Sequence, residues 1–159
     1  MSECSHWHAE EKRLVKVRIG LDVGSWHGYA AEFVWAEPKG CTVLIRNIPF
    51  YAHGISYDDE FSVALEDDFP SAKEKVASGG HSTYRVFVKL GQESHAIEYW
   101  KNLEDLGCTY ERATEHLIAI DVPPTSDVRR VYTLLKNGES TGVWDFEEGN
   151  YAGADIEDA

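Results

Sequence analysis

Residues 83–147 read TYRVFVKLGQESHAIEYWKNLEDLGCTYERATEHLIAIDVPPTSDVRRVYTLLKNGESTGVWDFE, and the order of patterns in this stretch decides the fold. It opens with apolar and polar residues alternating over 83–88, which is typical of a strand. A helical pattern follows, because apolar residues recur at spacings of three between Ser94, its expected cap, and Gly107, its expected end. The stretch therefore begins as a strand followed by a helix.

The rest of this stretch completes a known order of elements. Further strands are expected at residues 108–113, 116–122 and 142–147. Ser126 or Asp127 can cap a second helix, which ends at Asn137-Gly138. The sum is β-α-β-β-α-β, which predicts a ferredoxin-like half in which two helices cover one face of a four-stranded antiparallel sheet. A fold of this type hosts many activities and fixes none of them.

Upstream of this half, short alternating runs separated by turn residues predict a small β-barrel or curled sheet. Its strands are expected at residues 14–19, 29–37, 41–46 and 61–65. The fold class is therefore α+β, with these parts along the chain: a mobile leader over 1–12, a β-rich subdomain over 13–66, a linker over 67–80, the ferredoxin-like subdomain over 81–149 and an acidic tail over 150–159.

Charge excludes two classes of partner. The chain has 15 Lys and Arg against 28 Asp and Glu, a formal net charge of −13, which repels nucleic acid and anionic membrane surfaces alike. No apolar run approaches the ~20 residues that span a bilayer, and no export signal is visible. The cysteines are odd in number and far apart, so a reducing compartment is the simpler assumption. We expect a cytoplasmic protein that is a monomer when free.

Catalytic and metal motifs are missing from the sequence. It contains no phosphate loop, nucleophile elbow or zinc-protease helix, so we expect no enzyme and no cofactor. Cys4, His6 and His8 alternate near the N-terminus without the fixed pairs of a structural metal site, so no metal is expected. Cys108 is expected to be a buried packing residue.

Three words of the sequence resemble a known family. They are Trp35-Ala36-Glu37-Pro38, the run from Asn47 to Asp59, and Gly80-His81-Ser82-Thr83-Tyr84-Arg85. They are similar to the bacterial family called domain of unknown function 4265, and the resemblance covers residues 14–148. It implies a bacterial cytosolic protein and supplies no reaction. Small proteins of this kind also resemble immunity proteins that are encoded beside secreted toxins.

The first functional hypothesis is therefore an immunity-type inhibitor that occludes the basic cleft of a cognate toxin. Its acidic face from residue 139 onward and the aromatic loop 47–59 would supply the contacts, since acidic groups speed encounter and aromatic side chains anchor complexes. The expected partner-binding residues are Tyr51, His53, Tyr57, Asp58, Asp59, Asp145, Glu147 and Glu148. A structural alternative for this loop is that Ile48, Phe50 and Ile55 anchor a long connection onto the barrel while Tyr57 and Asp58 hold its backbone.

Two rival hypotheses stay open. The first is a small-molecule sensor or enzyme that uses a cleft between the two halves, with His53, His81 and Arg85 as its polar groups. The His81-Ser82-Thr83 word is similar to the His-x-Thr element of two-histidine phosphoesterases, but the sequence lacks the second copy that this chemistry needs. The other rival is a regulatory interaction module with no toxin involved.

Overall fold

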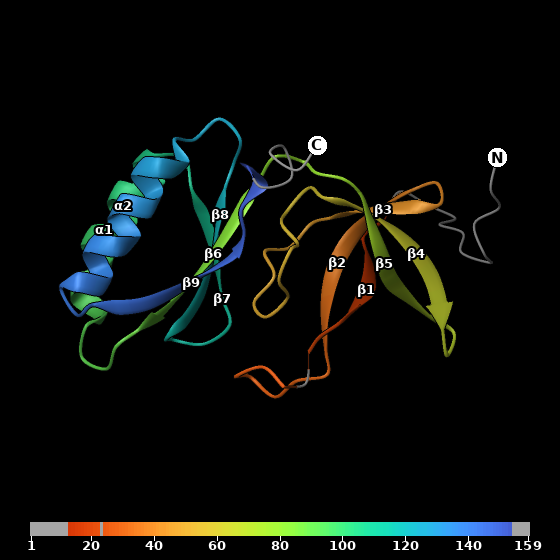
Figure 1. Cartoon of the computed structure of the whole chain (residues 1–159), viewed down its shortest axis with the longest axis horizontal. Helices are drawn as coiled ribbons and strands as arrows, with labels where there is room; N and C mark the ends of the chain where they lie inside the picture. Colours follow the sequence, from red (N-terminus) through yellow and green to blue (C-terminus); the bar gives the residue numbers. More distant parts are fainter. Residues whose placement is uncertain (1–12, 23, 154–159) are drawn as a thin grey trace.

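The computed structural model describes residues 13–22 and 24–153, which form two halves lying side by side (Figure 1). The first half is a closed barrel of five strands: β1 (Val15–Gly20), β2 (Ala31–Lys39), β3 (Thr42–Ile45), β4 (Glu60–Glu66) and β5 (Phe69–Ala77). Successive strands are antiparallel, and the ring closes where Arg18 of β1 pairs in parallel with Ser71 of β5. The predicted barrel is confirmed.

Alternation along the strands fills the barrel. Every second residue of β1, β2 and β3 points inward, because successive side chains of a strand face opposite sides. The buried interior includes Val17, Ile19, Val34, Ala36, Val43, Ile45, Phe61 and Val63. The residues between them face outward, and Phe33 and Trp35 of β2 are exposed on the barrel surface.

The predicted linker over 67–80 is wrong in most of its length, since it contains strand β5. The sequence FPSAKEKVA hides this strand because only Ser71 is buried in it, and its other positions are partly or fully exposed. A strand that contributes so little to the core carries no apolar alternation. It is nevertheless required, because without it the barrel would be an open sheet with two free edges.

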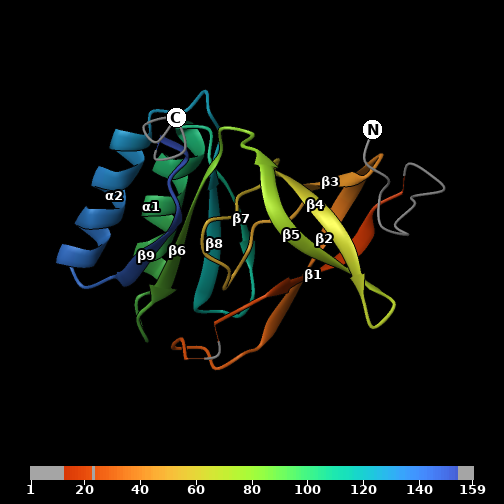
Figure 2. The ribbon, with the colours of Figure 1, turned by 45° about the vertical axis from the view of Figure 1, so that its right-hand side comes forward.

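The second half has the predicted β-α-β-β-α-β order. Its elements are β6 (Ser82–Val88), α1 (Glu93–Asp105), β7 (Thr109–Arg112), β8 (Leu117–Val122), α2 (Val128–Ser140) and β9 (Trp144–Asn150). The four strands form one antiparallel sheet in the order β7-β8-β6-β9. Both helices cover the same face of it (Figure 2).

The helix ends correct one detail of the prediction. Ser94 lies inside α1, whose N-cap is Gln92 and makes no capping bond with its side chain. Asp127 caps α2 as expected, with its carboxylate accepting the amides of Arg129 and Arg130. Neither helix in the described part of the chain is long and apolar enough to cross a membrane.

The second sheet is covered on both faces, which places β8 in the core at every position. Its helix side is apolar and joins Tyr84, Val86 and Val88 to Trp100, Leu135 and Trp144. The other side faces the barrel. The register sets Arg85 opposite both Ala119 and Glu147, so these side chains share the barrel side.

Candidate functional site

The connection from residue 46 to residue 59 lies between the two halves of the molecule (Figure 1). Its backbone is held by Glu32 of β2, which is only 8% exposed. The Glu32 carboxylate accepts the amides of Phe50, Tyr51 and Ala52 at 2.6, 3.0 and 3.0 Å. A carboxylate that accepts several amide bonds fixes the backbone strongly. The loop is therefore a rigid part of the fold.

A second carboxylate reaches the same loop from the other half. Glu111 of β7 accepts the amide of Ile48 at 2.6 Å and the side-chain amide of Asn47 at 3.1 Å. The Asn47 side-chain oxygen in turn accepts the amide of Trp35 at 2.6 Å. One asparagine thus connects β2 of the barrel to β7 of the second sheet.

Arg85 of β6 is the most buried cation in the described part of the chain, at 0% exposure. Its Nε donates to Glu147 at 2.8 Å, and its Nη atoms donate to the carbonyls of Ala52 at 2.8 Å, Pro49 at 3.3 Å and Tyr51 at 3.4 Å. These four acceptors engage all three nitrogens of the guanidinium. Arg85 is therefore not free to bind a ligand. The small-molecule hypothesis required that it should be.

Asp59 is buried as well, at 0% exposure, and it is out of reach of a partner. Its carboxylate accepts the amides of Ser56 and Gly79 and lies 3.2 Å from the Lys75 ammonium. Burial raises the pKa of Asp59, against the lowering effect of those two amides and of Lys75. We expected Asp59 to contact a partner. That expectation is wrong, because its buried carboxylate holds the loop through bonds inside the protein.

Hydroxyl and amide side chains complete the junction. The Ser56 hydroxyl lies 2.6 Å from that of Thr83 and accepts the Asn150 side-chain amide at 2.9 Å. The Gly54 amide donates to the Gly149 carbonyl at 2.8 Å. Ile48 and Ile55 are buried and Phe50 is half-buried, as the structural alternative expected. The loop backbone is held by the side chains of Glu32, Glu111, Arg85 and Asp59, and not by those of Tyr57 and Asp58 as that alternative expected.

His81 lies at the edge of this junction and is paired with a carboxylate. Its Nδ1 is 2.9 Å from both oxygens of Asp121, and the hydrogen bond raises the pKa of His81 against the opposing effect of burial. The Tyr57 ring packs on it at 5.4 Å between centroids. Tyr57 and its neighbour Asp58 also contact Arg46, by a cation–π contact and an ion pair. His81 is thus half-buried and hydrogen-bonded to Asp121 at this edge.

The predicted acidic side chains of β9 are divided in their roles. Asp145 is exposed and lies 3.8 Å from Lys89. Glu147 is bonded to Arg85, and Glu148 accepts the Tyr84 hydroxyl at 3.3 Å. His53 is exposed in the loop. The expected partner-binding residues therefore do not all face solvent: His53, Asp145 and Glu148 are exposed, whereas Tyr51, Tyr57, Asp58 and Glu147 are half-buried and Asp59 is buried.

The cysteines and possible metal ligands form no metal site in the described part of the chain. Cys4, His6 and His8 lie outside the described residues, and no group of His, Cys, Asp and Glu within those residues could hold a metal ion. Cys108 is buried as expected, and burial raises the pKa of its thiol to about 12. Cys41 is disulfide-bonded, whereas Cys108 is a free thiol.

An aromatic cluster lies where the β1–β2 connection reaches across to the second sheet (Figures 1 and 2). We use this name for Trp26, His27, Tyr29, Tyr51 and Phe87. Trp26 contacts Phe87 of β6 at 5.0 Å and Tyr51 of the loop at 5.7 Å, and Tyr29 contacts Tyr51 at 5.0 Å, between ring centroids. Trp26 and Tyr29 are nevertheless 55% and 54% exposed. The cluster joins three segments of the chain and leaves two large rings in solvent.

Local bonds fix the conformation of this cluster. The Gly28 amide donates to the Ser25 carbonyl, and Gly28 has a φ of +73°, which favours glycine. His27 Nδ1 accepts the amide of Tyr29 at 2.9 Å. Burial, Tyr29 and Glu32 together raise the pKa of Tyr51, so it stays neutral. The exposed rings are therefore held in place before any partner arrives.

Only part of this site could be predicted from the sequence. Tyr51 was among the expected partner residues, and the tryptophan at position 26 falls in a turn of the sequence. Tyr29 was placed inside a strand that the structure begins only at Ala31. Phe87 faces the barrel side of β6, and Asp145 is its cross-strand neighbour. The sequence alone does not show that Phe87 and Asp145 are neighbours on adjacent strands.

Comparisons with known proteins place the chain in a family and in a fold. A family model described as Domain of unknown function (DUF4265) matches residues 32–146. A crystal structure described as a hypothetical protein from Neisseria gonorrhoeae is similar with a TM-score of 0.70 and 17% identity, covering 90% of this chain and 97% of that one. At that identity the likeness shows the fold alone. No curated protein matches the sequence.

Proposed function

We propose that this chain, which belongs to the DUF4265 family, works by binding another protein through its aromatic cluster. The observation that supports this function is the exposure of Trp26 and Tyr29 in a cluster whose other rings are packed. Tryptophan and tyrosine supply large contact areas at a low entropic cost, and they are enriched among the residues that dominate binding energies.

The rigidity of the cluster strengthens this proposal. Its Tyr51 belongs to a backbone held by Glu32 and Arg85, and its Trp26 packs on Phe87 of the second sheet. A partner therefore meets side chains that are already ordered, and less conformational entropy is lost on binding. The buried polar junction thus supports the exposed site beside it.

Charge points to the chemistry of the partner. Asp145 pairs across the strands with Phe87, which contacts Trp26, so an exposed carboxylate lies beside the cluster. The chain carries a formal net charge of −13. A basic protein would be attracted by this field, and its Lys or Arg side chains could stack on Trp26 and Tyr29.

The finer form of the proposal is an immunity protein that neutralises a basic toxin encoded by the adjacent gene. An aromatic anchor with a neighbouring carboxylate fits a surface that covers a basic cleft. The rival that places a ligand among His53, His81 and Arg85 loses one of its three groups, because Arg85 is buried and bonded to Glu147 and the loop.

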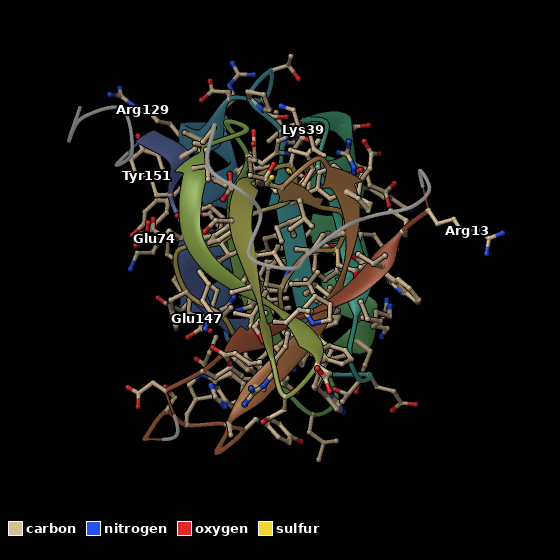
Figure 3. All side chains as sticks on the ribbon, turned by 90° about the vertical axis from the view of Figure 1, so that its right-hand side faces the viewer. Arg13, Lys39, Glu74, Arg129, Glu147 and Tyr151 are labelled. Atoms are coloured by element: carbon tan, nitrogen blue, oxygen red, sulfur yellow. The ribbon has the colours of Figure 1, made fainter. Side chains whose placement is uncertain are left out.

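Co-expression with the product of the adjacent gene tests the proposal. We expect the two proteins to elute together, and Trp26→Ala and Asp145→Lys each to weaken the complex. The control is Glu74→Lys, which changes the net charge by the same amount at an exposed position on β5 of the barrel (Figure 3). If the complex forms equally well with all three variants, the aromatic cluster is not the binding site.

Growth measurements separate the coarse proposal from the finer one. If the adjacent gene product arrests growth and co-expression restores it, the immunity proposal is supported. If the two proteins bind and growth is unaffected in every combination, protein binding stands and the toxin proposal fails.

A further inference from the structure

A hollow of about 310 Å³ lies between the first half of α2 and the end of β9. We name it the tyrosine hollow, because Tyr84, Tyr132 and Tyr151 line it together with Arg129 and Glu148. Tyr84 projects to the helix side of the second sheet, whereas Phe87 of the aromatic cluster projects to the barrel side. The hollow is therefore separate from the proposed protein-binding site.

Aromatic rings make the walls of the tyrosine hollow. Tyr84 is 2% exposed, and the Tyr132 ring lies 6.5 Å from it between centroids. The Tyr151 ring folds back over Gly153, where a Cβ would lie 2.2 Å from its Cζ. The walls are thus largely apolar, as in sites for small molecules.

Two opposite charges line the same hollow without meeting. Arg129 makes no ion pair within the described part of the chain, and neither does Glu148, whose carboxylate accepts the Tyr84 hydroxyl at 3.3 Å. Figure 3 shows Arg129 and Tyr151 at the same edge of the molecule. Arg129 is also in the first turn of α2, where a positive charge opposes the helix dipole. Its guanidinium has no carboxylate partner among the described residues and can therefore donate to an anionic ligand.

We infer that the tyrosine hollow binds a free α-amino acid with an apolar or aromatic side chain. Such a molecule carries a carboxylate for Arg129, an ammonium group for Glu148 and a body that packs on the tyrosine rings. The Tyr84 hydroxyl is a positioning group, because its hydrogen bond orients the Glu148 carboxylate. The volume of the hollow is at the small end of ligand sites, as this class of molecule requires.

Calorimetry on the full chain with L-phenylalanine, L-tyrosine, L-tryptophan and L-leucine tests the inference. We expect at least one of them to bind. For L-phenylalanine, phenylpropionate lacks the ammonium group and phenethylamine lacks the carboxylate, and each should bind about tenfold more weakly or worse. Failure of all four amino acids to bind with a dissociation constant below about 1 mM overturns the inference. Equal binding of phenethylamine and the amino acid also overturns it.

Variants locate the site. Arg129→Gln and Glu148→Gln should each weaken amino acid binding about tenfold or more. Arg130→Gln is the matched control, because Arg130 is the next residue on α2 and does not line the tyrosine hollow. Circular dichroism checks that every variant is folded. If Arg130→Gln weakens binding as much as Arg129→Gln, the ligand is held elsewhere. None of these results depends on the aromatic cluster, so the proposed function stands or falls separately.

Discussion

The two sides of the second sheet are held by different forces. The helix side buries Val86, Leu135 and Trp144 in one apolar cluster. The barrel side buries Arg85, which bonds to Glu147 and to three carbonyls of the loop. The apolar contacts on the helix side have no preferred direction and so tolerate small shifts. The hydrogen bonds on the barrel side fix angles and distances.

This difference explains where a binding site can form. On the barrel side, the charged groups bond to one another and to the loop inside the molecule. The place where we expected a ligand cleft between the two halves is therefore filled by a structural junction. That junction keeps the Tyr51 backbone rigid, and the aromatic cluster stands at its rim. The buried polar bonds thus act on function by positioning exposed rings.

Arg85→Ala gives the largest expected effect. It removes the only cation from a buried set of acceptors and leaves Glu147 without its partner, at a cost of about 4 kcal/mol in the free energy of unfolding. Urea denaturation followed by circular dichroism measures it. Arg85→Lys is the control that keeps the charge but loses the fork of donors, so it should fall between wild type and Arg85→Ala. An unchanged midpoint for Arg85→Ala would show that the junction is not held by this residue.

Leu135→Ala tests the apolar side. The side chain is fully buried between the sheet and α2, so its loss should cost about 3 kcal/mol in the free energy of unfolding. Binding to the partner should be unchanged in native conditions, because the cluster lies on the other side of the sheet. If Leu135→Ala destabilised the protein more than Arg85→Ala, the apolar side of the sheet would contribute more to stability than the polar side, contrary to our expectation.

Glu32→Gln tests whether the loop backbone needs a charged acceptor. Three amides donate to this carboxylate, and the weaker bonds of an amide oxygen should reduce the free energy of unfolding by about 2 kcal/mol. Partner binding should weaken as well, since Tyr51 loses its fixed backbone. Glu37→Gln, on the same strand and half-exposed, is the control. If Glu32→Gln lowers neither stability nor binding, the loop is held by other contacts.

His81 gives the smallest effect, visible in the pH profile of stability. Its pKa in the folded protein is raised by Asp121 above the unfolded value of about 6.5. The folded state therefore holds the proton more tightly. The resulting stabilisation is complete below about pH 6.5 and is lost as the pH rises through the folded pKa. Chemical denaturation across this range measures it. His81→Gln should remove the slope, and His95→Gln, at an exposed histidine on α1, should keep it.

The sequence was sufficient to predict which residues are buried on the apolar helix side of the second sheet. It was insufficient to predict the buried polar bonds on the barrel side. Residues such as Trp100 and Trp144 recur at helix and strand spacing, so their burial could be predicted. Arg85 sits in an alternating strand, where a charged residue is expected to face water. Nothing local shows that a loop more than thirty residues earlier supplies its acceptors at Pro49, Tyr51 and Ala52.

Strand β5 and the aromatic cluster escaped prediction for related reasons. β5 contributes little apolar surface, so its alternation is weak, and only closure of the barrel requires it. The rings of the cluster come from three separated segments, and Trp26 meets Phe87 only after the two halves pack together. Contacts between distant segments leave no periodic mark in the sequence.

The dissociation constant of the complex with the adjacent gene product tests the central claim most directly, measured for wild type, Trp26→Ala and Trp35→Ala. Both tryptophans are exposed, but Trp35 lies on the barrel surface beneath the Lys16 ammonium, away from the aromatic cluster. We predict that Trp26→Ala costs at least about 2 kcal/mol of binding free energy and that Trp35→Ala leaves binding unchanged. Equal affinities for wild type and Trp26→Ala, with both proteins folded, would contradict the account.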